Sequence, residues 1–330
     1  MMKNLSLTVF CVMFIHLFVG FTKDPGKKQP AQKPALKTII IDAGHGGSAT
    51  GAKGEFSYEK NICLAIALKL GKKLEQAYPD MQVLYTRTTD ATTNNRWRAD
   101  FANKNSGDLF LSIHANAMSP IKHTKFLGYK KETYYTGKGK NRKKKTRSVP
   151  RYSVYTTPNL RFGTETYIWA ADRTDAKGEF VGEQVQEQRD STDEFVPDIT
   201  DPEFKAKSLL WTKKYFDKSL ILASMVEEEF GKAGRTSYGV KQRTWEGIWV
   251  LQATAMPSIL VETGFITNPD EEKYLNSEDG QNEVADNVFS AVKRYKTTLE
   301  SKQAQGSGAK VTSPKQNTKP AAANTVAKRK

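Results

Sequence analysis

Three short apolar runs in the sequence each lead into polar side chains that could carry out acid–base or metal chemistry. His45 follows the first run after a short Asp-Ala-Gly segment, His114 follows the second directly, and Glu262 follows the third directly. The runs are Thr38–Ile41, Leu109–Ile113 and Ser258–Val261. Each run is predicted to be a buried strand, because it is short and rich in aliphatic and β-branched residues. Ligand crevices of open α/β sheets form at the carboxyl ends of the strands, so we expect the three side chains to converge.

Two imidazoles and one carboxylate form a ligand set that holds a catalytic zinc ion and leaves one coordination position open. The chain has four histidines, of which His16 lies in the N-terminal apolar segment. An isolated histidine is more often an ordinary hydrogen-bonded residue, but His45 and His114 both stand at strand ends. The pattern therefore indicates a site for one Zn²⁺ ion, with these histidines and one glutamate as ligands. Zinc is inferred from the ligand type, since nitrogen and oxygen sites bind several divalent metals.

The elements around these residues alternate between strands and helices, which is typical of an α/β sheet. Helices are predicted at 59–78, 97–103, 206–231 and 281–299, and further strands at 81–86 and 164–169. The segments at about 120–160 and 171–205 interrupt this scheme and are predicted to be insertions. Arg87, Arg96 and Arg98 are expected to form structural ion pairs and not to act in catalysis.

Both ends of the chain are predicted to lie outside the folded domain, which is expected to span 37–300. Residues 1–21 combine a lysine with an apolar run and are typical of a signal peptide. This favours a secreted protein that is periplasmic or associated with the cell envelope. The run is short for a membrane span, so we expect no stable membrane insertion after cleavage, with a retained anchor as the alternative. Residues 22–36 and 301–330 have little to bury and are predicted to be a disordered linker and a disordered basic tail.

The formal net charge of +15 is concentrated in two segments of the chain. Segment 137–151 has eight lysines and arginines, the tail from Ser301 has seven, and neither segment has an acidic residue. Together they account for the whole excess, so the remainder of the chain is neutral in sum. A nucleic-acid partner is suggested by the charge alone and is not expected.

Four motifs are more specific than any of these features taken alone. They are IDAGHGG at 41–47, YEKN at 58–61, LSIHAN at 111–116 and VETGFITN at 261–268. With these motifs in this order, the chain resembles the zinc-dependent N-acetylmuramoyl-L-alanine amidases, the type 3 amidases among the cell-wall hydrolases. The resemblance covers about residues 37–298 apart from the insertions, and it departs from the family pattern at Ala43, where many members have proline. It implies a three-layer α/β/α fold with a mostly parallel central sheet of about six strands.

The resemblance also implies a role for each site residue. His45, Glu59 and His114 match the zinc ligands, and Glu262 matches the catalytic acid/base. The implied reaction is hydrolysis of the amide bond between N-acetylmuramic acid and L-alanine of the peptidoglycan stem peptide. Zinc-activated water would attack the carbonyl, and Glu262 would pass the proton to the leaving nitrogen. Glu165 matches a glutamate in the family's equivalent strand, where substrate contact or support of the site is expected.

The two insertions are expected to connect the enzyme to other molecules. Some family members that act in cell division carry an inserted helix at the place of 171–205, which covers the zinc until a partner removes it. We therefore predict an autoinhibitory segment here, with Glu183 or Glu187 capping the metal and a divisome activator protein as partner; a solvated surface helix or loop is the alternative. The basic segment 137–151 is predicted to lie on a loop that holds anionic wall polymers or acidic protein surfaces, or else is a solvated lobe.

Two other functions remain open at this point. A peptidoglycan-binding module could keep the fold without cleaving its ligand, and a zinc carboxypeptidase acting on the stem peptide could share the ligand chemistry. The presence of all four chemical residues argues against the first, and the order of the four motifs disfavours the second. The expected protein is a monomer that acts on peptidoglycan.

Overall fold

The computed structural model describes residues 34–173, 176–182, 201–244 and 247–308. A six-stranded sheet with the order β2-β1-β3-β8-β6-β7 lies at its centre. The strands are β1 (Thr38–Ala43), β2 (Gln82–Tyr85), β3 (Leu109–Asn116), β6 (Thr164–Ile168), β7 (Ser237–Gln242) and β8 (Ser258–Phe265). All neighbouring pairs are parallel except β6 with β8. The prediction of a mostly parallel sheet of about six strands is confirmed.

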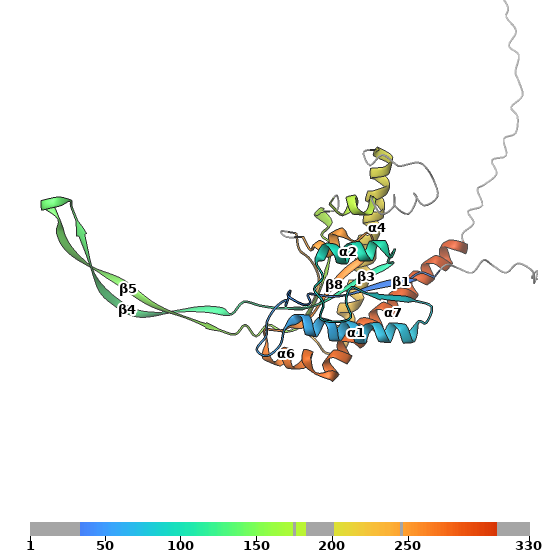
Figure 1. The fold of residues 1–330 in the computed structure, drawn as a ribbon, viewed down its shortest axis with the longest axis horizontal. Coiled ribbons are helices and arrows are strands. Elements are labelled where there is room, and N and C mark those ends of the chain that lie inside the picture. The colour runs from blue at the N-terminus through green and yellow to red at the C-terminus, as the bar shows by residue number, and fades with distance from the viewer. Residues whose placement is uncertain (1–33, 174–175, 183–200, 245–246, 309–330) are drawn as a thin grey trace, which may run out of the picture. The chain divides into compact units, whose positions relative to one another are not determined.

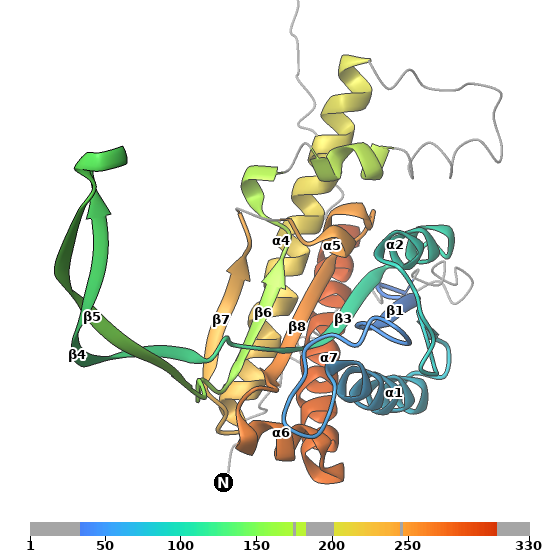
Figure 2. The same ribbon diagram turned by 60° about the vertical axis from the view of Figure 1, so that its left-hand side comes forward.

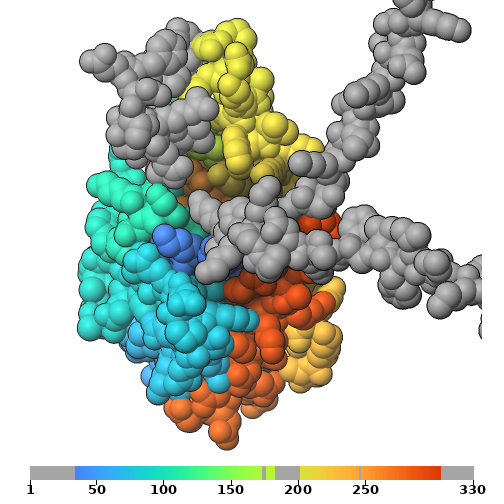
Figure 3. All heavy atoms as spheres, turned by 90° about the vertical axis from the view of Figure 1, so that its right-hand side faces the viewer, coloured from blue at the N-terminus to red at the C-terminus, as the bar shows by residue number. Residues whose placement is uncertain are grey.

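Helices cover both faces of this sheet, so the predicted three-layer architecture is also confirmed (Figure 2). The helices are α1 (Glu59–Ala77), α2 (Asn95–Lys104), α4 (Pro202–Lys232), α5 (Trp249–Ala253), α6 (Pro269–Asn276) and α7 (Glu278–Gly308). Ile39 and Ile41 of β1 pack in the core formed with α1, α4 and α7, whereas Ile40 packs in the core formed with α2 and α5. Strand β1 is buried on both faces, which explains the three consecutive isoleucines at 39–41. Helices α1 and α7 lie side by side on the face shown in Figure 3.

Several element boundaries differ from the predicted ones. Helix α7 continues to Gly308, past the boundary predicted at 300. Leu36, in the predicted linker, is buried in the core, so the ordered chain begins slightly earlier than expected. Strand β7 was not predicted, because its sequence SYGVKQ has no apolar alternation. None of the helices within the described residues is long and apolar enough to cross a membrane.

Residues 121–157 form an antiparallel hairpin separate from the central sheet (Figure 1). Its strands β4 (Ile121–Thr136) and β5 (Lys143–Thr157) pair with each other and are joined through η1 (Gly139–Asn141). The prediction that the basic segment 137–151 lies on a loop is therefore wrong for 143–151, which belong to β5. No residue of either strand is buried, so the hairpin lacks the apolar alternation by which a half-buried strand is recognised.

Several predictions concern residues outside the described ranges. Glu183 and Glu187 lie there, together with most of the acidic insertion. The signal peptide at 1–21, most of the linker and most of the basic tail also lie there. These features stay predictions.

Candidate active site

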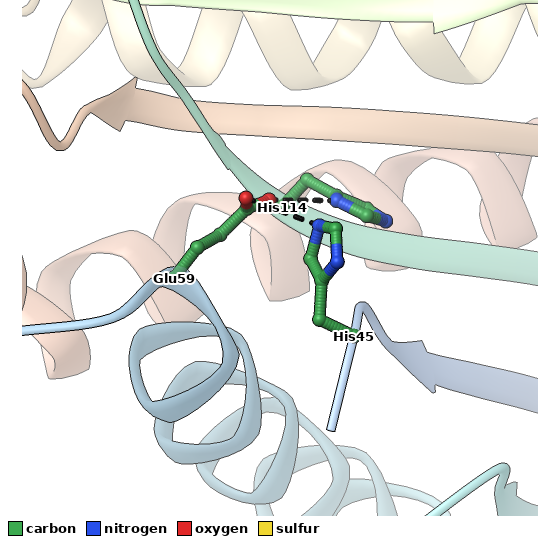
Figure 4. Close-up of side chains that lie close together, drawn as sticks. All are labelled: His45, Glu59 and His114. Carbon is green, nitrogen blue, oxygen red and sulfur yellow. Dashed lines mark hydrogen bonds and ion pairs between the residues drawn. The ribbon is translucent and has the colours of Figure 1, made fainter. Parts of the chain in front are cut away.

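Three side chains from three separate elements meet at one edge of the sheet (Figure 4). His45 follows β1, Glu59 is the first residue of α1, and His114 lies near the end of β3. His45 Nε2 lies 3.0 Å from Glu59 Oε2, and His114 Nδ1 lies 2.8 Å from Glu59 Oε1. The centroids of the two imidazole rings are 4.9 Å apart, with an angle of 76° between the ring planes. The structure thus brings the two predicted histidines together and places Glu59 between them.

The chemistry and spacing of this cluster suit a metal ion. One donor atom from each of the three side chains lies within 4.8 Å of the others. Zinc binds imidazole nitrogen and carboxylate oxygen at about 2.0–2.2 Å, so small side-chain movements would bring all three donors to one ion. Two neutral nitrogens and one anionic oxygen leave room for a fourth ligand. The residues present therefore fit a catalytic zinc site.

Two glycines provide the space in which the cluster lies. A Cβ atom on Gly44 would lie 2.4 Å from the His114 ring, and one on Gly51 would lie 2.5 Å from Glu59 Oε2. Both distances are far inside van der Waals contact, so any side chain at either position would displace a member of the cluster. His45 has a φ of +60°, in the left-handed region that is unfavourable for a residue with a Cβ. Its conformation must be held by neighbouring groups.

Two buried arginines hold the loop that carries His45. Arg87 Nη2 donates to the Gly44 carbonyl at 2.7 Å, and Arg98 Nη2 donates to the His45 carbonyl at 2.5 Å. Arg98 also forms an ion pair with Asp42 at 2.5 Å, and its side chain is only 2% exposed. Arg98 is thus the structural ion-pair partner that was expected, whereas the hydrogen bonds of Arg87 go to backbone carbonyls.

The Asp42 carboxylate links three elements beneath the site. Thr86 Oγ1 donates to it at 2.7 Å and Ser112 Oγ donates at 2.6 Å, in addition to the Arg98 ion pair. Burial by itself would raise the pKa of Asp42, but the charge of Arg98 and the two hydroxyl hydrogen bonds outweigh it and hold the pKa below its usual value. Asp42 is therefore ionised at neutral pH and fixes β1 against β3 and α2.

Glu59 is held as an anion by four hydrogen bonds. Besides the two histidines, the backbone N–H groups of Ala52 and Ala115 donate to its carboxylate at 2.8 and 3.2 Å. Burial opposes ionisation, but the hydrogen bonds from His114 and His45 hold the pKa of Glu59 well below its usual range. The helix N-terminus at which it stands also favours negative charge. Glu59 therefore has the charge that a metal ligand needs.

Glu262 lies on the neighbouring strand β8, and its pKa is shifted in the direction opposite to that of Glu59. It is directly across from His114 in the β3–β8 pair and across from Glu165 in the β6–β8 pair. It is only 9% exposed, and its Oε2 atom has no hydrogen-bond partner within the described part of the chain. Burial and then the negative charges of Glu59 and Glu165 raise the pKa of Glu262 well above its usual value, which Arg243 only partly offsets. These surroundings therefore favour the protonated form of Glu262 over its anion.

Glu165 is buried beside this group, and its Oε1 atom accepts two hydrogen bonds. It accepts from Asn116 Nδ2 at 2.6 Å and from the Tyr167 hydroxyl at 2.9 Å, and Arg161 Nη2 lies 3.6 Å away. These contacts fix the Asn116 side chain two residues after His114. In the structure Glu165 orders the surroundings of the site and lies outside the His45–Glu59–His114 cluster.

An open cavity of about 720 Å³ contains all four predicted chemical residues. Its other lining side chains include Asn94, Asn95, Asn116, Arg243, Ile248 and Trp249. Arg243 and Trp249 were not predicted as site residues, because Arg243 follows β7 and Trp249 begins α5, and neither element was predicted from the sequence. Arg243 also lies over the ring of Tyr167, with 5.2 Å between its guanidinium carbon and the ring centroid. It adds positive charge to a cavity that contains two glutamates.

A short helical segment, residues 176–182, packs next to this cavity. Lys177 Nζ is buried and donates to the carbonyls of Leu251 and Thr254 at 2.5 and 2.6 Å. The Phe180 ring contacts the ring of Trp249 edge-on, with 5.9 Å between centroids. Because Trp249 lines the cavity, this segment is anchored at its rim.

The family model and the curated relatives that match this chain all describe the same kind of enzyme. Residues 39–294 match a family model described as N-acetylmuramoyl-L-alanine amidase. The chain is 28% identical over 272 residues to the N-acetylmuramoyl-L-alanine amidase AmiC of Escherichia coli O6:H1, covering 82% of this chain and 55% of that protein. It is 29% identical over 278 residues to AmiC of Neisseria meningitidis serogroup B, covering 84% of this chain and 56% of that protein. The chain thus spans about half the length of these relatives.

Among solved structures, the N-acetylmuramyl-L-alanine amidase Ami1 of Mycobacterium smegmatis matches with a TM-score of 0.50. The sequences are 14% identical, and the match covers 79% of this chain and 97% of that chain. At this level of identity the match supports a common fold.

Proposed function

The chain belongs to the N-acetylmuramoyl-L-alanine amidase family, and from this premise we propose that it hydrolyses the amide bond between N-acetylmuramic acid and L-alanine in peptidoglycan. We propose further that one zinc ion, held by His45, Glu59 and His114, takes part in the reaction. The observation that carries the proposal is that this ligand set shares one open cavity with the buried Glu262, whose Oε2 atom has no hydrogen-bond partner among the described residues. A non-catalytic binding module would have no need of a buried carboxylate with a raised pKa beside a metal-ligand cluster.

The residues of the chain have distinct tasks in this mechanism. A zinc ion bound at the cluster would supply Lewis acidity, polarising the scissile carbonyl and making water reactive at neutral pH. Glu262 takes the proton from the attacking water and returns it to the alanine nitrogen, because an amine leaves poorly unless it is protonated. Its raised pKa keeps the proton available for this second transfer. Arg87 and Arg98 keep His45 in its left-handed conformation, so that the ligands are ordered before substrate binds.

Zinc binding and peptide release, measured on the same samples, test this proposal. The His114→Ala variant should lose both stoichiometric zinc, measured by elemental mass spectrometry, and release of peptide from a soluble muramyl peptide. The Glu262→Gln variant should keep its zinc and lose peptide release. His123→Ala is the matched control, since His123 lies on β4, stacks on Tyr155 and is outside the cluster. Peptide release by chelated protein, or full activity of Glu262→Gln, would contradict the assignment.

We also propose that the acidic insertion limits access to the site until a partner protein displaces it. The support is the segment 176–182, which Lys177 and Phe180 anchor at the rim of the cavity, directly before Glu183 and Glu187 in the sequence. Deleting 174–200 should raise the turnover on purified sacculi. An unchanged turnover would rule out autoinhibition by this segment.

Secretion is part of the same proposal, because peptidoglycan lies outside the cytoplasmic membrane. The support is the apolar run within residues 1–21. Cell fractionation of the full-length chain and of a chain without residues 1–21 should find only the former in the envelope fractions. Equal distribution of both would contradict secretion by this segment.

A further inference from the structure

The β4–β5 hairpin is a large part of the described structure that the proposed chemistry does not use. Residues 121–157 contain twelve lysines and arginines and one acidic residue, Glu132. Both faces are exposed, and the strands pair only with each other among the described elements. A two-stranded hairpin is marginally stable in water on its own, so a surface that covers it would also stabilise it.

One face of the hairpin is predominantly basic. Side chains at alternate positions of a strand share a face, which places Lys143, Lys145, Arg147 and Arg151 of β5 in one row. Lys130 of β4 lies opposite Val149 in the same face. The single acid, Glu132 of β4, lies on the same face opposite Arg147 and forms an ion pair with it at 2.8 Å. Most of the positive charge is therefore left without an acidic partner within the hairpin. This face suits an extended polyanion.

The other face carries a cluster of exposed aromatic rings. Phe126 lies opposite Tyr152 in the register, with 5.6 Å between ring centroids, and Tyr129 contacts Phe126 edge-on at 5.3 Å. These rings are 50%, 57% and 70% exposed for Phe126, Tyr152 and Tyr129 respectively. A bulge between Phe126 and Tyr129 turns both side chains to the same face, and Gly128 within it has a φ of +93°. An irregularity that collects rings on an open face points to a ligand with flat, partly apolar surfaces.

The proposed reaction itself produces a polymer with these properties. Hydrolysis breaks the C–N bond of the lactyl amide, adds the oxygen of water to the carbonyl carbon and moves a proton to the alanine nitrogen. Each cut therefore replaces a neutral amide on the glycan by a carboxylate and removes the peptide branch. The resulting strand is a regular polyanion whose sugar rings are free to lie against aromatic side chains.

We propose that the β4–β5 hairpin binds the peptide-free glycan strand that the amidase reaction leaves behind. The inference rests on the proposed function, which supplies the product. Because the two sets lie on opposite faces, the basic face pairs with the lactyl carboxylates of one strand, while the cluster of Phe126, Tyr129 and Tyr152 stacks on the sugar rings of a neighbouring strand. On an uncut strand the lactyl groups are neutral and the peptide branches prevent flat stacking. Binding of product would hold the enzyme at strands that it has begun to process.

Binding of the full, metal-free chain to four ligands tests this inference. The ligands are peptide-free glycan prepared with a different amidase, uncut glycan strands, neutral chitin oligomers and vesicles rich in anionic lipid. Peptide-free glycan should bind most tightly. Equal binding to uncut glycan, preference for the vesicles, or no binding to any glycan would overturn the proposal.

Variants of the two faces should separate charge from stacking. Lys143→Gln/Lys145→Gln/Arg151→Gln should weaken binding about ten-fold, as expected for the loss of three exposed charge pairs, and the loss should vanish at high salt. Tyr129→Ala/Tyr152→Ala should weaken binding by about the same factor at every salt concentration. Wild-type affinity in both variants would refute a role for the hairpin.

A matched control removes three charges elsewhere. Lys205→Gln/Lys207→Gln/Lys213→Gln changes three exposed lysines of α4 and should leave glycan binding unchanged. All variants should hydrolyse a small soluble muramyl peptide at the wild-type rate, which shows that they are folded. Absence of hydrolysis in the wild type would count against the proposed function, whereas the binding measurement, made with independently prepared glycan, reports on the hairpin alone.

Discussion

Replacing Arg98 by methionine tests whether the buried Asp42–Arg98 pair supports the site. Both side chains are almost completely inaccessible, at 2% and 1% exposure, and Arg98 also holds the His45 carbonyl. Removing one partner of a buried pair leaves an uncompensated charge and typically costs about 3–5 kcal/mol. Asp42 can limit this loss by binding a proton, which at pH 7 costs about 4 kcal/mol for a carboxyl with an ordinary pKa near 3.9. We therefore expect the free energy of unfolding to fall by about 3–4 kcal/mol at pH 7.

The loss of stability in Arg98→Met should depend on pH. In the wild type the pKa of Asp42 is lowered, so its contribution to stability is present above its unfolded-state pKa and is lost only at strongly acid pH. In Arg98→Met the pKa of Asp42 is raised by burial, so between about pH 4 and 7 the folded state binds more protons than the unfolded state. The variant is stabilised as the pH falls, and at pH 5 the loss should shrink to about 1.5 kcal/mol.

Urea unfolding of the metal-free proteins at pH 7 and pH 5 measures both quantities. Arg96→Met is the control, since Arg96 is exposed and lies 3.9 Å from Asp100, and it should cost less than about 0.5 kcal/mol. If Arg98→Met costs no more than this control, or if its loss does not depend on pH, the electrostatic account of the loop is wrong.

Three further predictions concern the cavity and its rim. Gly51→Ala should weaken zinc binding about ten-fold or more in calorimetry. The new Cβ would lie 2.5 Å from Glu59 Oε2, and the backbone φ of +67° is unfavourable for alanine. Unchanged affinity would show that the loop can adapt. Glu262→Gln should lower kcat by about 10²–10⁴-fold with zinc content unchanged, and a loss of zinc instead would make Glu262 a ligand. Burial lowers the pKa of Lys177 to about 7, so between pH 7 and about 10 the unfolded state binds more protons and stability rises with pH. From pH 7 to pH 9 the wild type should therefore gain about 2 kcal/mol relative to Lys177→Met, and parallel pH profiles for the two proteins would refute a neutral Lys177.

The parts of the fold that were predictable from the sequence are those whose apolar residues recur within a single strand or helix. Strand β1 contains three consecutive isoleucines because both of its faces are buried, and α1 has apolar residues at four-residue spacing from Ile62 onwards. His45 and His114 were recognisable because each comes after an apolar run in the sequence. These features depend on neighbours in the sequence, which is why pattern analysis finds them.

The remaining features depend on contacts between distant segments. The convergence of Glu262 with the two histidines was expected from the strand ends, but its position directly opposite His114 depends on the pairing of β8 with β3, which no local pattern specifies. Arg243 enters the cavity from the end of β7, which has no apolar alternation. The sequence of β5 does not predict a strand, because neither of its faces is buried and its lysines leave no alternation of apolar and polar residues.

The most direct test of the proposed amidase activity is mass spectrometry of sacculi digested in heavy-oxygen water by wild type, Glu262→Ala and chelated wild type. The proposed function predicts that wild type alone releases intact stem peptides beginning with L-alanine and leaves one heavy oxygen on each new lactyl carboxylate. Cleavage within the stem peptide would instead indicate a carboxypeptidase. No release, even after deletion of 174–200, would leave a binding module and contradict the amidase mechanism.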